Sequence, residues 1–177
     1  EGTSATFDDG NGSMIITNVA GTGNTTNTAT ANVFIGRNSG LGIVGQANNT
    51  FVGSYSGDGS TSDQAAYFGR SAGAGTSGRG NVAMGYVAGA GLRSNYNEGL
   101  GYFSFRDGPS TGVGNVGIGY ETGRVNTTGY QNSFVGYQAG RNNTTGYHSH
   151  NSIARSSDDE DSSENSEQEP TFKPSQY

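Results

Sequence analysis

Seven copies of one phrase recur between Asn32 and Gly140, and this repeat constrains the fold more than any other feature of the sequence. The phrase reads Asn-x-aromatic-aliphatic-Gly-x-x-small-Gly, and its central glycines lie 16 to 18 residues apart. A fixed period of this length is typical of stacked repeat architectures. The central glycines are Gly36, Gly53, Gly69, Gly85, Gly101, Gly119 and Gly136.

The repeat predicts short strands joined by glycine turns. No long stretch has a 3.6-residue period, and glycine every few residues disfavours helices. Only 30% of the 177 residues are hydrophobic, and a solenoid manages with such a small core because each coil buries a few residues against its neighbours. The predicted fold class is therefore all-β, a parallel β-solenoid (β-roll) of about seven coils of 16–18 residues.

The chain divides into three predicted parts. Residues 1–31 lack the phrase and are placed to form an N-terminal cap that shields the open end of the stack. Residues 32–155 hold the solenoid repeats. An eighth copy begins at Asn151 as NSIAR, and the array is expected to end there because Arg155 replaces the central glycine. Residues 156–177 form an extended tail with seven acidic residues against Lys173.

Two columns of side chains are expected to point into the solenoid. The third residue after each central glycine is always small, and the residue before it is always apolar. Stacked in register, these positions predict one small and one large inward column. The predicted large column is Ile35, Val52, Phe68, Met84, Leu100, Ile118 and Val135.

The residue two before each central glycine has the opposite strand parity, so we expect it to point outward. Outward aromatic side chains would form an exposed apolar stripe, which usually marks an interface. The alternative is that this column packs against the loops between repeats. The predicted assembly residues at this position are Phe34, Phe51, Tyr67 and Phe134. A separate tyrosine ladder is predicted one residue after the central glycine, at Tyr86, Tyr102, Tyr120 and Tyr137.

The leading asparagine of the phrase predicts a structural column. In-register stacking lets each side-chain amide hydrogen-bond the amides above and below it, as in the asparagine ladders of cross-β stacks. The ladder residues are Asn32, Asn49, Asn81, Asn97, Asn115 and Asn132.

The sequence favours neither catalysis nor nucleic-acid binding. There are no cysteines, no grouping of serine, histidine and aspartate has a spacing cue, and none of the GxGxxG patterns opens a helix. Scattered arginines without a basic run make a poor phosphate footprint, and no apolar run approaches the length of a membrane span. We expect no enzyme, no cofactor or metal, no nucleic-acid partner and no membrane span.

The chain begins at Glu1 and shows no apolar signal segment, so we expect a processed mature form or a fragment, and favour an extracellular protein, secreted or on a surface appendage. Six Asn-x-Ser/Thr sequons lie outside the strand cores, where a glycan could be tolerated. The candidate glycosylation sites are Asn11, Asn24, Asn48, Asn126, Asn142 and Asn143.

The last residues of the tail combine two prolines with two aromatic residues, Phe172 and Tyr177. Such an extended segment can dock on a neighbouring subunit by strand addition or by binding in a groove. Arginines spread along the repeats have the sign that complements the acidic tail, and arginine holds carboxylates well. We expect the tail to help connect copies of the chain.

Over residues 32–140 the phrase N-V-F-I-G-x-x-S/A-G resembles the head repeats of trimeric autotransporter adhesins and the related repeats of phage tail fibres. The resemblance implies a left-handed parallel β-roll, side-by-side packing of three chains, and adhesion. Together with the repeat itself, it leaves two functional expectations. One is a non-enzymatic structural subunit of an extracellular fibre or filament that self-assembles. The other is an adhesin or tail-fibre head that binds a surface glycan or receptor.

Overall fold

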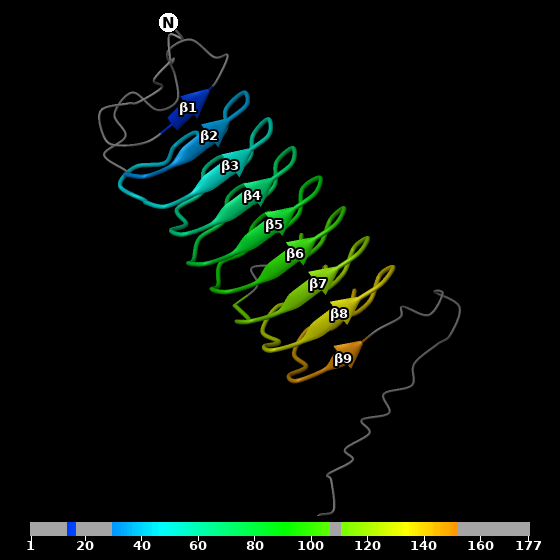
Figure 1. The fold of residues 1–177 in the computed structure, drawn as a ribbon. Coiled ribbons are helices and arrows are strands. Elements are labelled where there is room, and N and C mark those ends of the chain that lie inside the picture. Colours follow the sequence, from blue (N-terminus) through cyan, green and yellow to red (C-terminus); the bar gives the residue numbers. More distant parts are fainter. Residues whose placement is uncertain (1–13, 17–29, 107–110, 152–177) are drawn as a thin grey trace, which may run out of the picture.

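The computed structural model describes residues 14–16, 30–106 and 111–151, and the predicted all-β parallel solenoid is confirmed. Each strand pairs in parallel with the next one along the chain, so that sequence order and spatial order coincide (Figure 1). The strands of the described residues are β1 (Met14–Ile16), β2 (Val33–Ile35), β3 (Thr50–Val52), β4 (Ala66–Phe68), β5 (Val82–Met84), β6 (Glu98–Leu100), β7 (Val116–Ile118), β8 (Ser133–Val135) and β9 (His150–Asn151).

The central glycine turns the chain at the end of each repeat strand. The φ angles of these seven glycines lie between 123° at Gly136 and 135° at Gly53 and Gly85, a region that side chains other than glycine rarely adopt. The neighbouring coil also requires glycine here, because a Cβ atom at Gly53 would lie 2.5 Å from the carbonyl oxygen of Gly69. The repeat spacing of the sequence is therefore the spacing of backbone turns stacked directly on one another.

Backbone hydrogen bonds join the coils beyond the strands as well. Gly53 N–H donates to the Ile35 carbonyl at 2.7 Å, and Tyr55 N–H donates to the Arg37 carbonyl at 2.8 Å, both in the preceding coil. Gly57 N–H donates forward to the Ala72 carbonyl at 2.8 Å. Each coil is thus bonded to both neighbours around much of its perimeter, which fixes the register of the whole stack.

The core lies behind the middle residue of each strand. Phe34, Phe51 and Tyr67 are fully buried, and their rings stack with centroids 5.2 Å and 4.8 Å apart. The small residues three positions after the central glycines are buried opposite them, as expected. This small column is Ser39, Ser56, Ala72, Ala88, Ser104, Thr122 and Ala139.

The predicted large inward column is wrong, because the two strand faces are reversed. Each strand of β2 to β8 buries only its middle residue, so the residue before the central glycine faces outward and is half-buried or exposed. This column is uniformly hydrophobic in sequence although it is not buried. The residues corrected from core to outward-facing are Ile35, Val52, Phe68, Met84, Leu100, Ile118 and Val135.

The inward column can vary in size because one residue fills the space that others leave. Gly99 and Gly117 stand where other repeats have an aromatic ring. Phe105 replaces the last glycine of the fifth copy, adopts a φ of 50° and is only 2% exposed. Its Cε2 lies 2.8 Å from the place a Cβ would take at Gly117, and its ring centroid is 6.3 Å from that of Phe134.

The two ends of the sheet differ from the sequence expectation. Strand β1 lies inside the predicted cap and pairs in register with β2, so one further strand precedes those of the seven copies. At the other end Phe134 pairs with Asn151, and Ser149 N–H donates to Asn132 Oδ1 at 2.9 Å. Ser149, and not Asn151, therefore occupies the asparagine position. Residues 1–13 and 17–29 of the predicted cap, and the tail at residues 156–177, lie outside the described residues.

We expect adjacent residues of β3 to respond very differently to truncation. Phe51→Ala removes a fully buried ring and should lower the free energy of unfolding by about 3–5 kcal/mol. Val52→Ala, on the outward face, should lower it by less than about 1 kcal/mol. Urea unfolding of both variants measures the difference. An equal or larger loss of stability for Val52→Ala would show that the residue before the central glycine, and not the middle residue of the strand, forms the core.

Two glycines with positive φ offer a matched test of coil stacking. Gly85 has a φ of 135°, and an added Cβ would meet the Gly101 backbone, whereas Gly75 has a φ of 66° and open space around it. Gly75→Ala should cost about 1–2 kcal/mol from the left-handed conformation alone. Gly85→Ala should cost more than about 3 kcal/mol in thermal or urea unfolding, because conformational strain and collision add. Similar losses for the two variants would show that the stack does not depend on this close approach.

Candidate assembly surface

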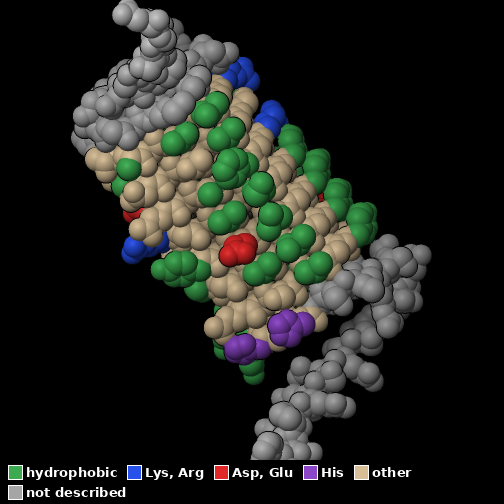
Figure 2. Space-filling model, viewed as in Figure 1, with side chains coloured by type: hydrophobic (Ala, Val, Ile, Leu, Met, Phe, Trp, Pro, Cys, Tyr) green, Lys and Arg blue, Asp and Glu red, His purple; other side chains and the backbone are tan. Residues whose placement is uncertain are grey.

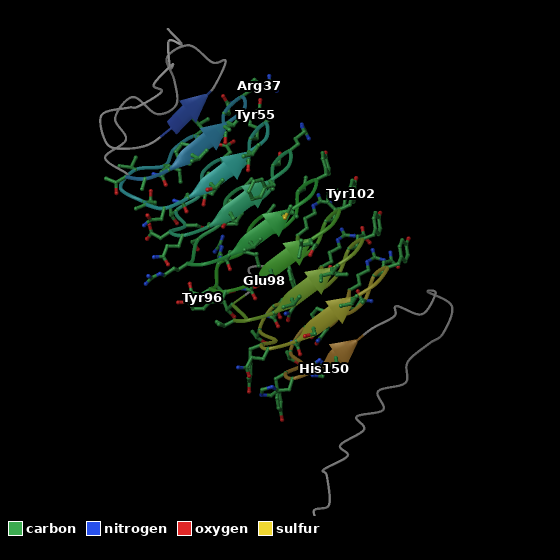
Figure 3. All side chains as sticks on the ribbon, in the orientation of Figure 1. Arg37, Tyr55, Tyr96, Glu98, Tyr102 and His150 are labelled. Atoms are coloured by element: carbon green, nitrogen blue, oxygen red, sulfur yellow. The ribbon has the colours of Figure 1, made fainter. Side chains whose placement is uncertain are left out.

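The outward residues of β2 to β8 form a mostly apolar surface, which we call the outer sheet face. Figure 2 shows hydrophobic side chains gathered over the strands. Glu98 is the only charged residue in these seven strands and lies near the middle of the stack (Figure 3). Met84, Ile118 and Val135 are 43%, 44% and 44% exposed. The other four residues before the central glycines are half-buried, so apolar side chains remain partly open to solvent along the whole face. Apolar surface gathered on one exposed face is a common mark of an interaction site.

A ladder of stacked tyrosines runs along the turns that follow the strands. The centroids of Tyr86, Tyr102, Tyr120 and Tyr137 are 5.1, 5.3 and 5.1 Å apart, with interplanar angles of 15° or less. Arg70 closes one end of the ladder, with its Nη1 donating to the Tyr86 hydroxyl at 2.9 Å. The predicted tyrosine ladder is therefore present, and its rings expose their edges while their faces cover one another.

The ladder changes the acidity of one member. Partial desolvation within the stack, followed by the negative charge of Glu121, raises the pKa of Tyr120 above its usual value. Glu121 itself is 6% exposed, accepts a hydrogen bond from Arg124 at 2.9 Å and forms an ion pair with Arg141 at 3.2 Å. These two arginines, which were expected to meet the acidic tail, contact a carboxylate of their own chain, Arg124 within the coil of Glu121 and Arg141 from the next coil.

The asparagine column is buried along its whole length, with each residue at most 1% exposed. In most steps the side-chain oxygen accepts from the backbone N–H at the same position of the next coil, as Asn97 Oδ1 does from Asn115 N at 3.0 Å. Bonds between the amides themselves occur at two steps, for example Asn132 Nδ2 to Asn115 Oδ1 at 3.1 Å. The amide nitrogens of Asn115 and Asn132 also donate to loop carbonyls. The column therefore ties strands to turns and offers no open ligand site.

The four aromatic residues predicted to mediate assembly cannot do so. Their side chains are fully buried in the core of their own chain, so no partner can reach them. Phe172 and Tyr177, the other two predicted assembly residues, lie outside the described residues. The residues excluded from an interface are Phe34, Phe51, Tyr67 and Phe134.

The sequence contains a signal that the aromatic residues of the phrase point inward. A Cβ at Gly40 would lie 2.8 Å from the Phe34 ring, so the final glycine of the phrase makes room for the aromatic residue. In the fifth copy the sizes are exchanged, with Gly99 at the aromatic position and Phe105 at the glycine position. Such a reciprocal exchange indicates that both positions fill the same space. They must therefore lie on the inner face together.

The candidate glycosylation sites separate by exposure. Asn48 and Asn142 are exposed and Asn143 is half-buried. Asn126 is 1% exposed, and its side chain hydrogen-bonds Gly129 through both Oδ1 and Nδ2. The prediction of a glycan at Asn126 is therefore wrong, because the side chain is not accessible. Asn11 and Asn24 lie outside the described residues.

The described residues contain no group of three or more histidine, cysteine, aspartate or glutamate side chains able to hold a metal ion. They also contain no helix that is long and apolar enough to cross a membrane. Comparison with family models, curated proteins and solved structures finds no significant match.

Proposed function

We propose that this protein is a non-enzymatic structural subunit of an extracellular fibre or filament, and that its copies associate through the outer sheet face, with the tail at residues 156–177 as a further connector. The observation that carries the proposal is the contrast between the two strand faces. The inner column varies from phenylalanine to glycine, whereas the outward residue before the central glycine is apolar in all seven copies.

This contrast points to a partner outside the chain. If the outward residue served only its own coil, polar side chains would be tolerated, because at three coils the residue is already 43–44% exposed. Covering these side chains with another apolar surface is favourable by about 25 cal/mol for each Å² removed from water. A second copy is a natural partner because its coils repeat with the same spacing, so that side-chain columns on the two faces can interleave along their length.

Glu98 limits how two copies can be arranged. Burying its carboxylate without a partner would cost several kcal/mol, and two such carboxylates facing each other would repel. Copies must therefore be offset along the rod, or Glu98 must meet a cation of the neighbouring chain. The charge thus selects a register in an interface that would otherwise allow sliding.

A second candidate function is a trimeric adhesin or tail-fibre head that recognises a surface glycan or receptor. A recess lined by Tyr96 and Tyr130 favours this function. The recess lies on the turns and not on the outer sheet face, so it offers a separate surface for a ligand. Self-assembly separates the two functions: a fibre subunit should polymerise alone, and an adhesin head should stop at a discrete oligomer.

The test is a charge placed on the outer sheet face. Ile118→Lys changes a residue that is already 44% exposed, so the fold should persist while association is lost. Val44→Lys is the matched control, because Val44 is 58% exposed in a loop outside the strands. Sedimentation velocity and electron microscopy should show filaments for the parent and for Val44→Lys, and single chains for Ile118→Lys.

Two results would contradict the proposal. The first is a parent chain that stays single at every concentration. The second is an Ile118→Lys variant that assembles like the parent. A discrete trimer that Ile118→Lys dissociates would instead favour the adhesin head.

A further inference from the structure

A recess of about 470 Å³ opens among the turns that precede β6, β7 and β8. Its walls are Tyr96 and Tyr130, its floor is the Gly112–Gly114 segment, and Thr111, Thr128 and Gln131 stand around it. Tyr96 lies on the opposite side of the strands from Tyr102, so the recess is separate from the tyrosine ladder (Figure 3). Its volume is within the range of small-molecule sites, roughly 300–1,000 Å³.

The recess exists because one coil lacks a side chain that its neighbours have. Tyr96, Gly114 and Gln131 occupy the same place in successive coils, directly before the asparagine column. The atom nearest to a Cβ built at Gly114 is Gln131 Cγ, at 3.7 Å. The coils of β6 and β8 are about 10 Å apart, twice the strand spacing, and the Gln131 side chain lies over Gly114 at one side of the space between them.

Each tyrosine wall is supported on the side away from the recess. The Tyr96 ring leans over Gly80 in the preceding coil, where its Cδ1 lies 2.7 Å from the place of an added Cβ. The Tyr130 ring stacks on Tyr147 at 5.5 Å with an interplanar angle of 10°. Tyr96 is 56% exposed and Tyr130 is 44% exposed, so both still present ring surface to a ligand.

The polar groups of the recess are uncharged. Thr111 Oγ1 donates to the Thr127 carbonyl at 3.1 Å and Thr128 Oγ1 donates to the Thr144 carbonyl at 3.4 Å, which leaves the hydroxyl oxygens as acceptors. The Gln131 amide is exposed and offers both a donor and an acceptor. Aromatic surface therefore faces the middle of a bound ring, and hydrogen-bonding groups face its rim.

We propose that this recess binds a neutral sugar ring. The C–H face of a pyranose matches the tyrosine rings and Val113, and its hydroxyls match the threonines and Gln131. A nucleotide would bring a phosphate for which the lining holds no cation, and an aromatic side chain would leave the polar rim unpaired. The inference is independent of assembly, since the recess does not include the outer sheet face.

The test is saturation-transfer NMR of the full chain with methyl glycosides of neutral hexoses and N-acetylhexosamines. We expect at least one glycoside to bind the parent. Tyr96→Ala should weaken that binding about tenfold, the effect of losing one aromatic contact. Tyr137→Ala is the matched control, because this residue is 64% exposed at the end of the tyrosine ladder, and it should bind as the parent does. Circular dichroism verifies the fold of both variants.

Binding should also persist in Ile118→Lys, so that a failure of assembly and a failure of sugar binding are seen separately. The proposal is overturned if no glycoside binds at millimolar concentration or if Tyr137→Ala weakens binding as much as Tyr96→Ala. It is equally overturned if only sulfated sugars or indole-containing peptides bind.

Discussion

Direct contact between backbones at the central glycines is the constraint on which the rest of the structure depends. At all seven positions the chain turns with a φ that favours glycine, and at the first six the next coil lies so close that no Cβ would fit. Stacking at this distance lets strand and turn amides bond from coil to coil and brings the asparagines into one buried column. The glycines make the close approach possible, and the asparagines fix its register.

Given such a rigid frame, the interior does not need a uniform set of side chains. Rings stack from Phe34 to Tyr67, small residues follow at Ala83, Gly99 and Gly117, and Phe105 enters from the opposite side to fill the space. The outer column shows the reverse pattern, with an apolar residue in every copy. A uniformly apolar outward column around a variable core is the feature on which the proposed assembly rests.

Much of the fold could be predicted from the sequence. The spacing of the central glycines predicted the parallel coils, and the phrase itself predicted the asparagine position and the small inward column. The direction of the strand faces could not be read from hydrophobicity, because Phe34 and Ile35 are both apolar neighbours in one strand. Size complementarity between Gly99 and Phe105 held that information. The pairing of β1 with β2 and the shifted register at Ser149 depend on tertiary contacts, since neither segment carries the full phrase.

The candidate surfaces were less predictable than the fold. The tyrosine ladder follows from one column of the repeat, but the recess depends on a gap at Gly114 between residues two coils apart. Such a gap is visible only once the loops of unequal length are aligned in space. Irregularities within a regular stack therefore held information that the repeat phrase itself did not.

The most direct test of the central claim uses single cysteines in a chain that has none of its own. Thiol labelling followed by mass spectrometry would compare Ile118→Cys on the outer sheet face with Ala83→Cys in the core, before and after assembly. The account predicts that Cys at position 118 reacts in dilute single chains and is protected in the assembly, while Cys at position 83 is protected in both. The account is contradicted if the thiol at position 118 stays reactive after assembly. It is also contradicted if, in single chains, the thiol at position 83 reacts faster than the thiol at position 118.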